Sequence, residues 1–130
     1  MKTVSKILFI VIVGILAGCG KTEKPLYDQV MDIHDEVMPK MGDLYKAKKQ
    51  LQDSIANTTT LSDDQKKEME STILTLDSAS NSMMVWMREF NPPEAHNKEE
   101  FNKYMESELV KVKKMREDVM EALKKIEKQH

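Results

Sequence analysis

The sequence predicts an all-α protein: an up-down-up antiparallel three-helix bundle with a kink in the first helix, preceded by a lipoprotein signal peptide. Aromatic residues make up only 5% of the 130 residues and charged residues 32%, which is typical of helices rather than of β-sandwiches or barrels. Four glycines and four prolines supply little turn material for many short strands. Apolar residues recur at intervals of three and four along three long stretches, which is the spacing of buried helical seams.

The first helix is expected to begin at Pro25, because proline is favoured in the first helical turn. Pro39 lies inside its apolar pattern, where a proline kinks or breaks a helix, and Gly42 loosens the same turn. We therefore expect a kink at residues 38–42, with a full break as the alternative. The expected seam consists of Leu26, Val30, Ile33, Val37, Met41, Leu44, Leu51 and Ile55.

The second and third helices have recognisable starts and one clear stop. Ser62 and Gln65 have the spacing of a capping box, which begins the second helix. The Asn-Pro-Pro segment at 91–93 ends that helix. Asn97 begins the third helix, which runs nearly to the C-terminus. Because the connections are short, neighbouring helices should be antiparallel; the alternative is an extended coiled coil assembled between chains. The expected seams are Met69, Ile73, Leu76, Ser80, Met83, Met87 and Phe90, then Phe101, Met105, Leu109, Val112, Met115, Val119, Leu123 and Ile126.

A targeting signal is expected ahead of the bundle. Residues 7–16 are apolar except for one glycine, but a helix needs about 20 such residues to span a bilayer. This length is typical of the apolar segment of a secretory signal peptide. The sequence Leu16-Ala17-Gly18-Cys19 that follows resembles the lipobox of bacterial lipoproteins at every position.

In that family the chain is cleaved before the cysteine, whose thiol is acylated. The resemblance implies a signal peptide at 1–18, a lipidated tether at 19–24 and a helical bundle at 25–130, with the lipid bilayer as partner through the acyl chains of Cys19. Gly20 is not the aspartate that retains such proteins at the inner membrane in the best-known sorting system. The expected location is therefore the cell envelope, with the outer membrane facing the periplasm favoured over the inner membrane.

The chain carries none of the motifs of common catalytic sites. It has no HExxH, GxSxG or CxxCH pattern and no glycine-rich phosphate loop, and its net charge of −2 does not favour nucleic-acid binding. The whole chain resembles small coiled-coil lipoproteins labelled "viral A-type inclusion protein", a label without a known activity. We expect a structural or interaction module with an envelope protein as partner, without enzymatic activity or a resident cofactor.

A shorter resemblance supports an alternative function. Residues 61–65, Leu-Ser-Asp-Asp-Gln, resemble the L-T-x-x-Q signature of CpxP/Spy-like periplasmic proteins, with Ser62 in place of threonine. The signature occurs once here, whereas that family typically shows two, and a capping box after a leucine gives the same pattern. It implies a metal-binding or chaperone-like protein of the envelope stress response.

Methionine is the remaining candidate for chemistry, since ten of the eleven methionines follow the signal peptide. An antiparallel pairing of the first two helices would bring a histidine and several thioethers to one end of the bundle. Thioethers and imidazole are ligands that suit Cu(I), although methionine also fills irregular gaps in a core. The candidate metal ligands are Met31, His34, Met38, Met83, Met84 and Met87.

Overall fold

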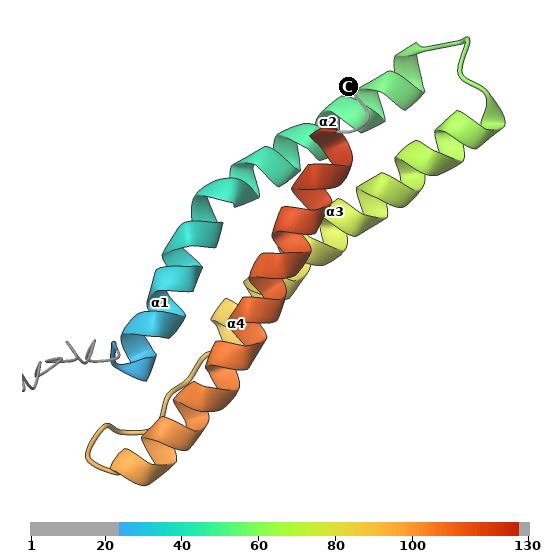
Figure 1. The fold of residues 1–130 in the computed structure, drawn as a ribbon. Coiled ribbons are helices and arrows are strands. Elements are labelled where there is room, and N and C mark those ends of the chain that lie inside the picture. The colour runs from blue at the N-terminus through green and yellow to red at the C-terminus, as the bar shows by residue number, and fades with distance from the viewer. Residues whose placement is uncertain (1–23, 128–130) are drawn as a thin grey trace, which may run out of the picture.

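The structure is a computed structural model that describes residues 24–127; the signal peptide, Cys19 and most of the tether lie outside this range. Within residues 24–127 every regular element is a helix, so the all-α bundle is confirmed (Figure 1). The elements are α1 (Leu26–Val37), the 3₁₀ turn η1 (Met38–Lys40), α2 (Met41–Asn57), α3 (Asp63–Glu89) and α4 (Lys98–Glu127).

The kink expected at residues 38–42 is present as η1. Pro39 has no N–H to donate to the helical ladder, and the chain tightens into one 3₁₀ turn around it. Lys40 and Met41 keep right-handed helical backbone angles, so the helix continues without the full break that was the alternative. One long bent helix, α1–η1–α2, therefore forms the first arm of the bundle (Figure 1).

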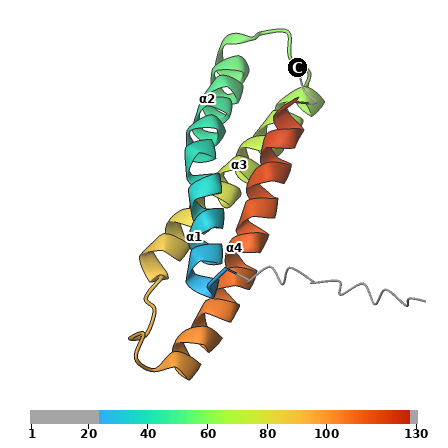
Figure 2. The ribbon, with the colours of Figure 1, turned by 60° about the vertical axis from the view of Figure 1, so that its left-hand side comes forward.

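The kink lies where the first arm changes its main neighbour. Before it, α1 packs chiefly against α4; after it, α2 packs chiefly against α3, while α3 and α4 pack against each other along their length. Figures 1 and 2 show α2 and α3 joined as a hairpin at one end and α3 and α4 joined through a loop at the other. Two ion pairs follow the same arrangement: Arg116 with Glu36 at 3.4 Å and Lys48 with Asp77 at 2.7 Å.

The helix starts are formed as the sequence predicts. The backbone N–H of Gln65 donates to Ser62 Oγ at 3.2 Å, and the Ser62 N–H donates to Gln65 Oε1 at 2.9 Å, which completes the capping box of α3. At the start of α4, Asn97 Nδ2 donates to Glu100 Oε2 at 2.7 Å and the Glu100 N–H donates to Asn97 Oδ1 at 3.4 Å. Both connections therefore end at the residues expected.

The core confirms most of the expected seams but corrects that of α3. Ser80, Met69 and Ile73 were expected inside yet are only half-buried, while Thr72 and Ala79 are buried. The reason is that α3 is in contact with both α2 and α4. Each neighbour buries one stripe of α3, and the residues buried most deeply lie between these two stripes. Ile55, expected in the seam of the first arm, is also only half-buried and lies outside the core cluster. The buried apolar side chains are Val30, Ile33, Val37, Leu44, Ala47, Leu76, Ala79, Met83, Trp86, Met105, Val112, Met115, Val119 and Ala122.

Candidate functional site

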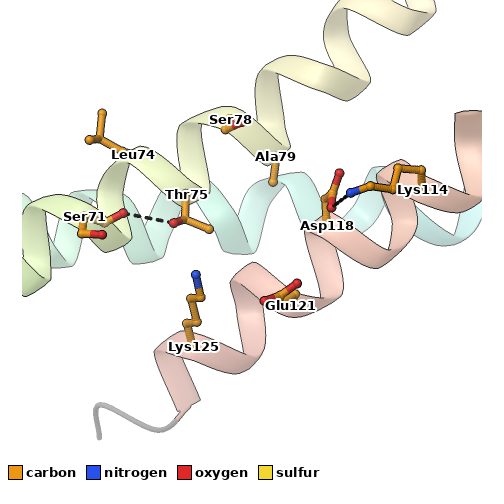
Figure 3. A pocket seen from close by; sticks show the side chains of 9 residues that line it. All are labelled: Ser71, Leu74, Thr75, Ser78, Ala79, Lys114, Asp118, Glu121 and Lys125. Atoms are coloured by element: carbon orange, nitrogen blue, oxygen red, sulfur yellow. Dashed lines mark hydrogen bonds and ion pairs between the residues drawn. The ribbon is translucent and has the colours of Figure 1, made fainter.

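An open groove runs between α3 and α4, and all the residues that line it belong to these two helices. Its first part has a volume of about 530 Å³, and Figure 3 shows short side chains of α3, such as Ser71, Thr75 and Ser78, opposite charged side chains of α4. Leu74 lies beside them with 70% of its surface exposed. We call this surface the α3–α4 groove; this part is lined by Ser71, Leu74, Thr75, Ser78, Ala79, Lys114, Asp118, Glu121 and Lys125.

The groove continues along the same two helices towards the α3–α4 loop. A second hollow of about 480 Å³ shares Lys114 and Asp118 with the first. These two side chains form an ion pair one turn apart on α4. The remaining lining residues are Ser82, Val85, Trp86, Glu89, Tyr104, Glu108, Lys111 and Met115.

A buried carboxylate lies at the floor of this second hollow. Trp86 Nε1–H donates to Glu108 Oε2 at 2.6 Å, and Lys111 Nζ donates to Glu108 Oε1 at 2.7 Å. The Glu108 side chain is only 3% exposed, whereas that of Lys111 is 61% exposed. The hydrogen bond to Glu108 raises the pKa of Lys111 above its usual 10.5. Each carboxylate oxygen thus has a donor, as burial of a charge requires.

Glu108 is not among the residues expected from the sequence to form a site, although the sequence carries a signal for it. Glu108 follows Met105 by three residues and precedes Val112 by four, so it occupies a position of the buried α4 seam. A charged residue at such a position needs a buried donor. The only tryptophan of the chain, on the helix before it, is the residue that meets this need.

A second cluster joins α1 to α3 through His34. Its Nε2 lies 3.3 Å from Met87 Sδ, and its Nδ1 lies 2.9 Å from Asp35 Oδ1. The imidazole is 20% exposed, and its ring centroid is 6.0 Å from that of Trp86. His34 therefore points to α3, as the predicted pairing of the first two helices required.

An aromatic series extends from this cluster into the α3–α4 loop. The ring centroids of Trp86 and Phe90 are 4.9 Å apart and those of Phe90 and Tyr104 are 6.0 Å apart, both pairs tilted. Tyr104 Oη accepts the backbone N–H of Asn91 at 2.8 Å. These contacts attach α1, α3, α4 and the loop to one another at this end of the bundle.

The other candidate metal ligands lie at different depths. Met83 is completely buried, and Met31 and Met38 are half-buried. Met84 is 50% exposed beside another hollow of α3, which shares Leu74 and Ser78 with the α3–α4 groove. His34 and Met87 are thus the candidate pair that the structure places in contact. Residues 24–127 bring together no three His, Cys, Asp or Glu side chains that could hold a metal ion.

The anchor predicted at Cys19 stays a prediction, since that residue lies outside the described range. No helix within residues 24–127 is both long enough and apolar enough to cross a membrane. The Leu-Ser-Asp-Asp-Gln segment at 61–65 is accounted for locally by the capping box of Ser62 and Gln65. The resemblance of that segment to periplasmic chaperones stays a prediction as well.

Comparison with known proteins yields no relative for this chain. No protein-family model, no curated protein and no solved structure matches it.

Proposed function

We propose that this chain is a lipid-anchored envelope protein, facing the periplasm, whose bundle acts as an interaction module without enzymatic activity. The observation that supports it best is the α3–α4 groove, a long hollow that neither α1 nor α2 lines. A protein with a purely structural role would not need an open groove on its surface, whereas a protein that binds a partner would. The anchor itself rests on the resemblance of residues 16–19 to the lipobox.

The groove has the shape that an additional helix needs. On α3, Ser71, Thr75, Ser78 and Ser82 follow one another at intervals of three and four, so they form one row along the groove. Such short side chains allow the backbone of a partner to approach closely. From Ser71 to Glu89 the groove follows 18 residues of α3, which is about 27 Å at 1.5 Å per residue. The partner we propose is a helical segment of about five turns in another envelope protein.

The charges along the groove favour a specific partner over a general chaperone function. Along the α4 wall the charges change sign in blocks, with two cations (Lys111 and Lys114), two anions (Asp118 and Glu121) and then Lys125. A partner with the opposite blocks of charge would form ion pairs in register, and like charges would oppose the wrong register. A chaperone for unfolded chains would instead offer a broad apolar surface. Seven of the nine residues that line the first part of the groove are polar, whereas the second part also has Val85, Trp86, Tyr104 and Met115 in its lining. Leu74 is the most exposed apolar side chain along the groove.

Site-specific photo-cross-linking in cells tests this proposal. A photoreactive residue at Ser78, in the α3–α4 groove, should give a discrete cross-linked product in the envelope fraction. The matched control is Lys46, which is exposed on α2 and does not line the groove. A photoreactive residue at Thr75 should give the same product. Adding the substitution Ser78→Arg to that variant should abolish the product, because the arginine side chain fills the groove. Products of the same size from Ser78 and Lys46, or none from the groove positions, would contradict the proposal.

A further inference from the structure

We infer that His34 and Met87 form the centre of a binding site for a soft monovalent metal ion, Cu(I). The site lies between α1 and α3 and shares neither residue with the α3–α4 groove. The inference is therefore independent of the proposed interaction function. The observation behind it is the short distance between the imidazole of His34 and the thioether of Met87.

The two ring nitrogens of His34 contact different kinds of atom, a carboxylate oxygen and a thioether sulfur. Asp35 Oδ1 lies 2.9 Å from Nδ1, and because a carboxylate can only accept, Nδ1–H donates a hydrogen bond to it; in a neutral ring Nε2 then keeps its lone pair. That lone pair faces Met87 Sδ at 3.3 Å, and a thioether sulfur has no proton to donate. An imidazole nitrogen and a thioether sulfur, each able to bind a soft cation through a lone pair, thus lie side by side.

The separation of the two atoms fits a shared metal ion. Zinc, a d¹⁰ ion like Cu(I), binds an imidazole nitrogen at about 2.0 Å and a cysteine thiolate sulfur at about 2.3 Å. With bonds of these lengths, two ligand atoms 3.3 Å apart subtend an angle of about 100° at the ion, close to the tetrahedral value. Asp35 then plays the part that carboxylates commonly have behind a metal-bound histidine, because it orients the ring and fixes its tautomer.

Further thioethers are available on the same face of the first arm. Met31 precedes His34 by three residues and Met38 follows it by four, so both flank it on the surface of the helix. Both are half-buried, and methionine has three rotatable bonds through which its sulfur can reach the site. One imidazole with two or three thioethers is a soft ligand set, which selects Cu(I) over Zn²⁺ or Mg²⁺.

Titration with Ag(I), which is a soft ion that is not oxidised under aerobic conditions, tests the inference directly. The probe is the fluorescence of Trp86, the only tryptophan, whose ring lies 6.0 Å from that of His34. The full chain should be used in detergent with Cys19→Ala, because Cys19 is the only thiol and would compete for the ion. One equivalent of Ag(I) should quench the fluorescence, and Cu(I) delivered anaerobically from a competing chelator should do the same.

Three variants distinguish a built site from general binding to methionine. His34→Gln and Met87→Leu should each raise the Kd for Ag(I) at least tenfold. The control Met69→Leu makes the same substitution at a half-buried position on the same helix, about 27 Å away at 1.5 Å per residue, and should leave the Kd unchanged. Far-ultraviolet circular dichroism checks that each variant stays helical. Equal affinities in all three variants, or competition by Zn²⁺ at the same concentration as Ag(I), would overturn the inference.

Discussion

The hydrogen bond between Trp86 and Glu108 makes a sharp prediction about stability. Nε1–H and Oε2 are 2.6 Å apart, and both side chains are buried between α3 and α4. We expect the substitutions Trp86→Phe and Glu108→Met to destabilise the bundle separately but to offset each other in part when combined. The reason is that each single change leaves a buried polar group without its partner, while the double change removes both groups.

The magnitudes follow from what each change exposes. Glu108→Met leaves the indole N–H without an acceptor, which costs about 1–3 kcal/mol. Trp86→Phe removes a hydrogen bond to a charged group, worth about 1.5–3 kcal/mol, and adds a cavity cost of about 1 kcal/mol for the smaller ring. Lys111 is 61% exposed, so the loss of its ion pair with Glu108 contributes less than about 1 kcal/mol. The double variant should cost about 2 kcal/mol less than the sum of the two.

Urea denaturation followed by far-ultraviolet circular dichroism measures all four proteins of this cycle. Tryptophan fluorescence cannot serve, because Trp86 is the only tryptophan. Stabilities of domains of this size are about 5–15 kcal/mol, so every variant should retain a measurable unfolding transition. If the cost of the double variant equals the sum of the single costs within about 0.5 kcal/mol, the two groups do not act as a buried pair and the reasoning is wrong.

Four further predictions concern the anchor, the kink and the core. Cys19→Ala should release the protein from the membrane fraction or leave an uncleaved precursor; wild-type fractionation and migration would contradict the lipid anchor. Pro39→Ala should not lower the urea midpoint, because the helix already continues through η1, and a lower midpoint would show that proline stabilises this turn. Gly42→Ala should stabilise the bundle by about 0.5–1 kcal/mol in the same assay, since a Cβ there meets no atom within 4 Å; destabilisation would refute this. Leu76→Asp should abolish the cooperative transition, because Leu76 is 1% exposed and an unpaired buried charge costs several kcal/mol; a native-like transition would place Leu76 outside the core.

The helices and their ends could be predicted because the signals for them are local. The capping box of Ser62 and Gln65, the stop at residues 91–93 and the distortion at Pro39 all involve residues within one or two turns of one another. Hydrogen bonds and steric clashes at that range do not depend on which helices pack together later. The seam of α4 was equally accessible, since a spacing of three and four places its residues on one face whatever its neighbour is.

The candidate metal ligands were predicted in part. Antiparallel pairing of the first two helices places His34 opposite the stretch that contains Met83, Met84 and Met87, and the structure shows His34 against Met87. That pairing sets only the level of the three methionines along the helix, and not how deeply each is buried. Met83 and Met87 are four residues apart and share one side of α3, whereas Met84 is turned away from Met83. Their burial distinguishes them. Met83 lies in the core and Met84 is 50% exposed, whereas Met87 is half-buried and contacts the imidazole of His34.

The all-α class, the three helical arms, their caps and the bend at Pro39 follow from the sequence, because each depends on residues that are neighbours along the chain. The pairing of the helices depends on packing between distant residues: α1 packs against α4, α2 packs against α3, and a groove is left between α3 and α4. The same packing buries Glu108 against Trp86 while its neighbour Lys111 stays in solvent. The physical reason is that a helix can rotate about its axis without changing its own hydrogen bonds. Its final rotation is set by the side chains of all the helices packed together, from residues far apart in the sequence.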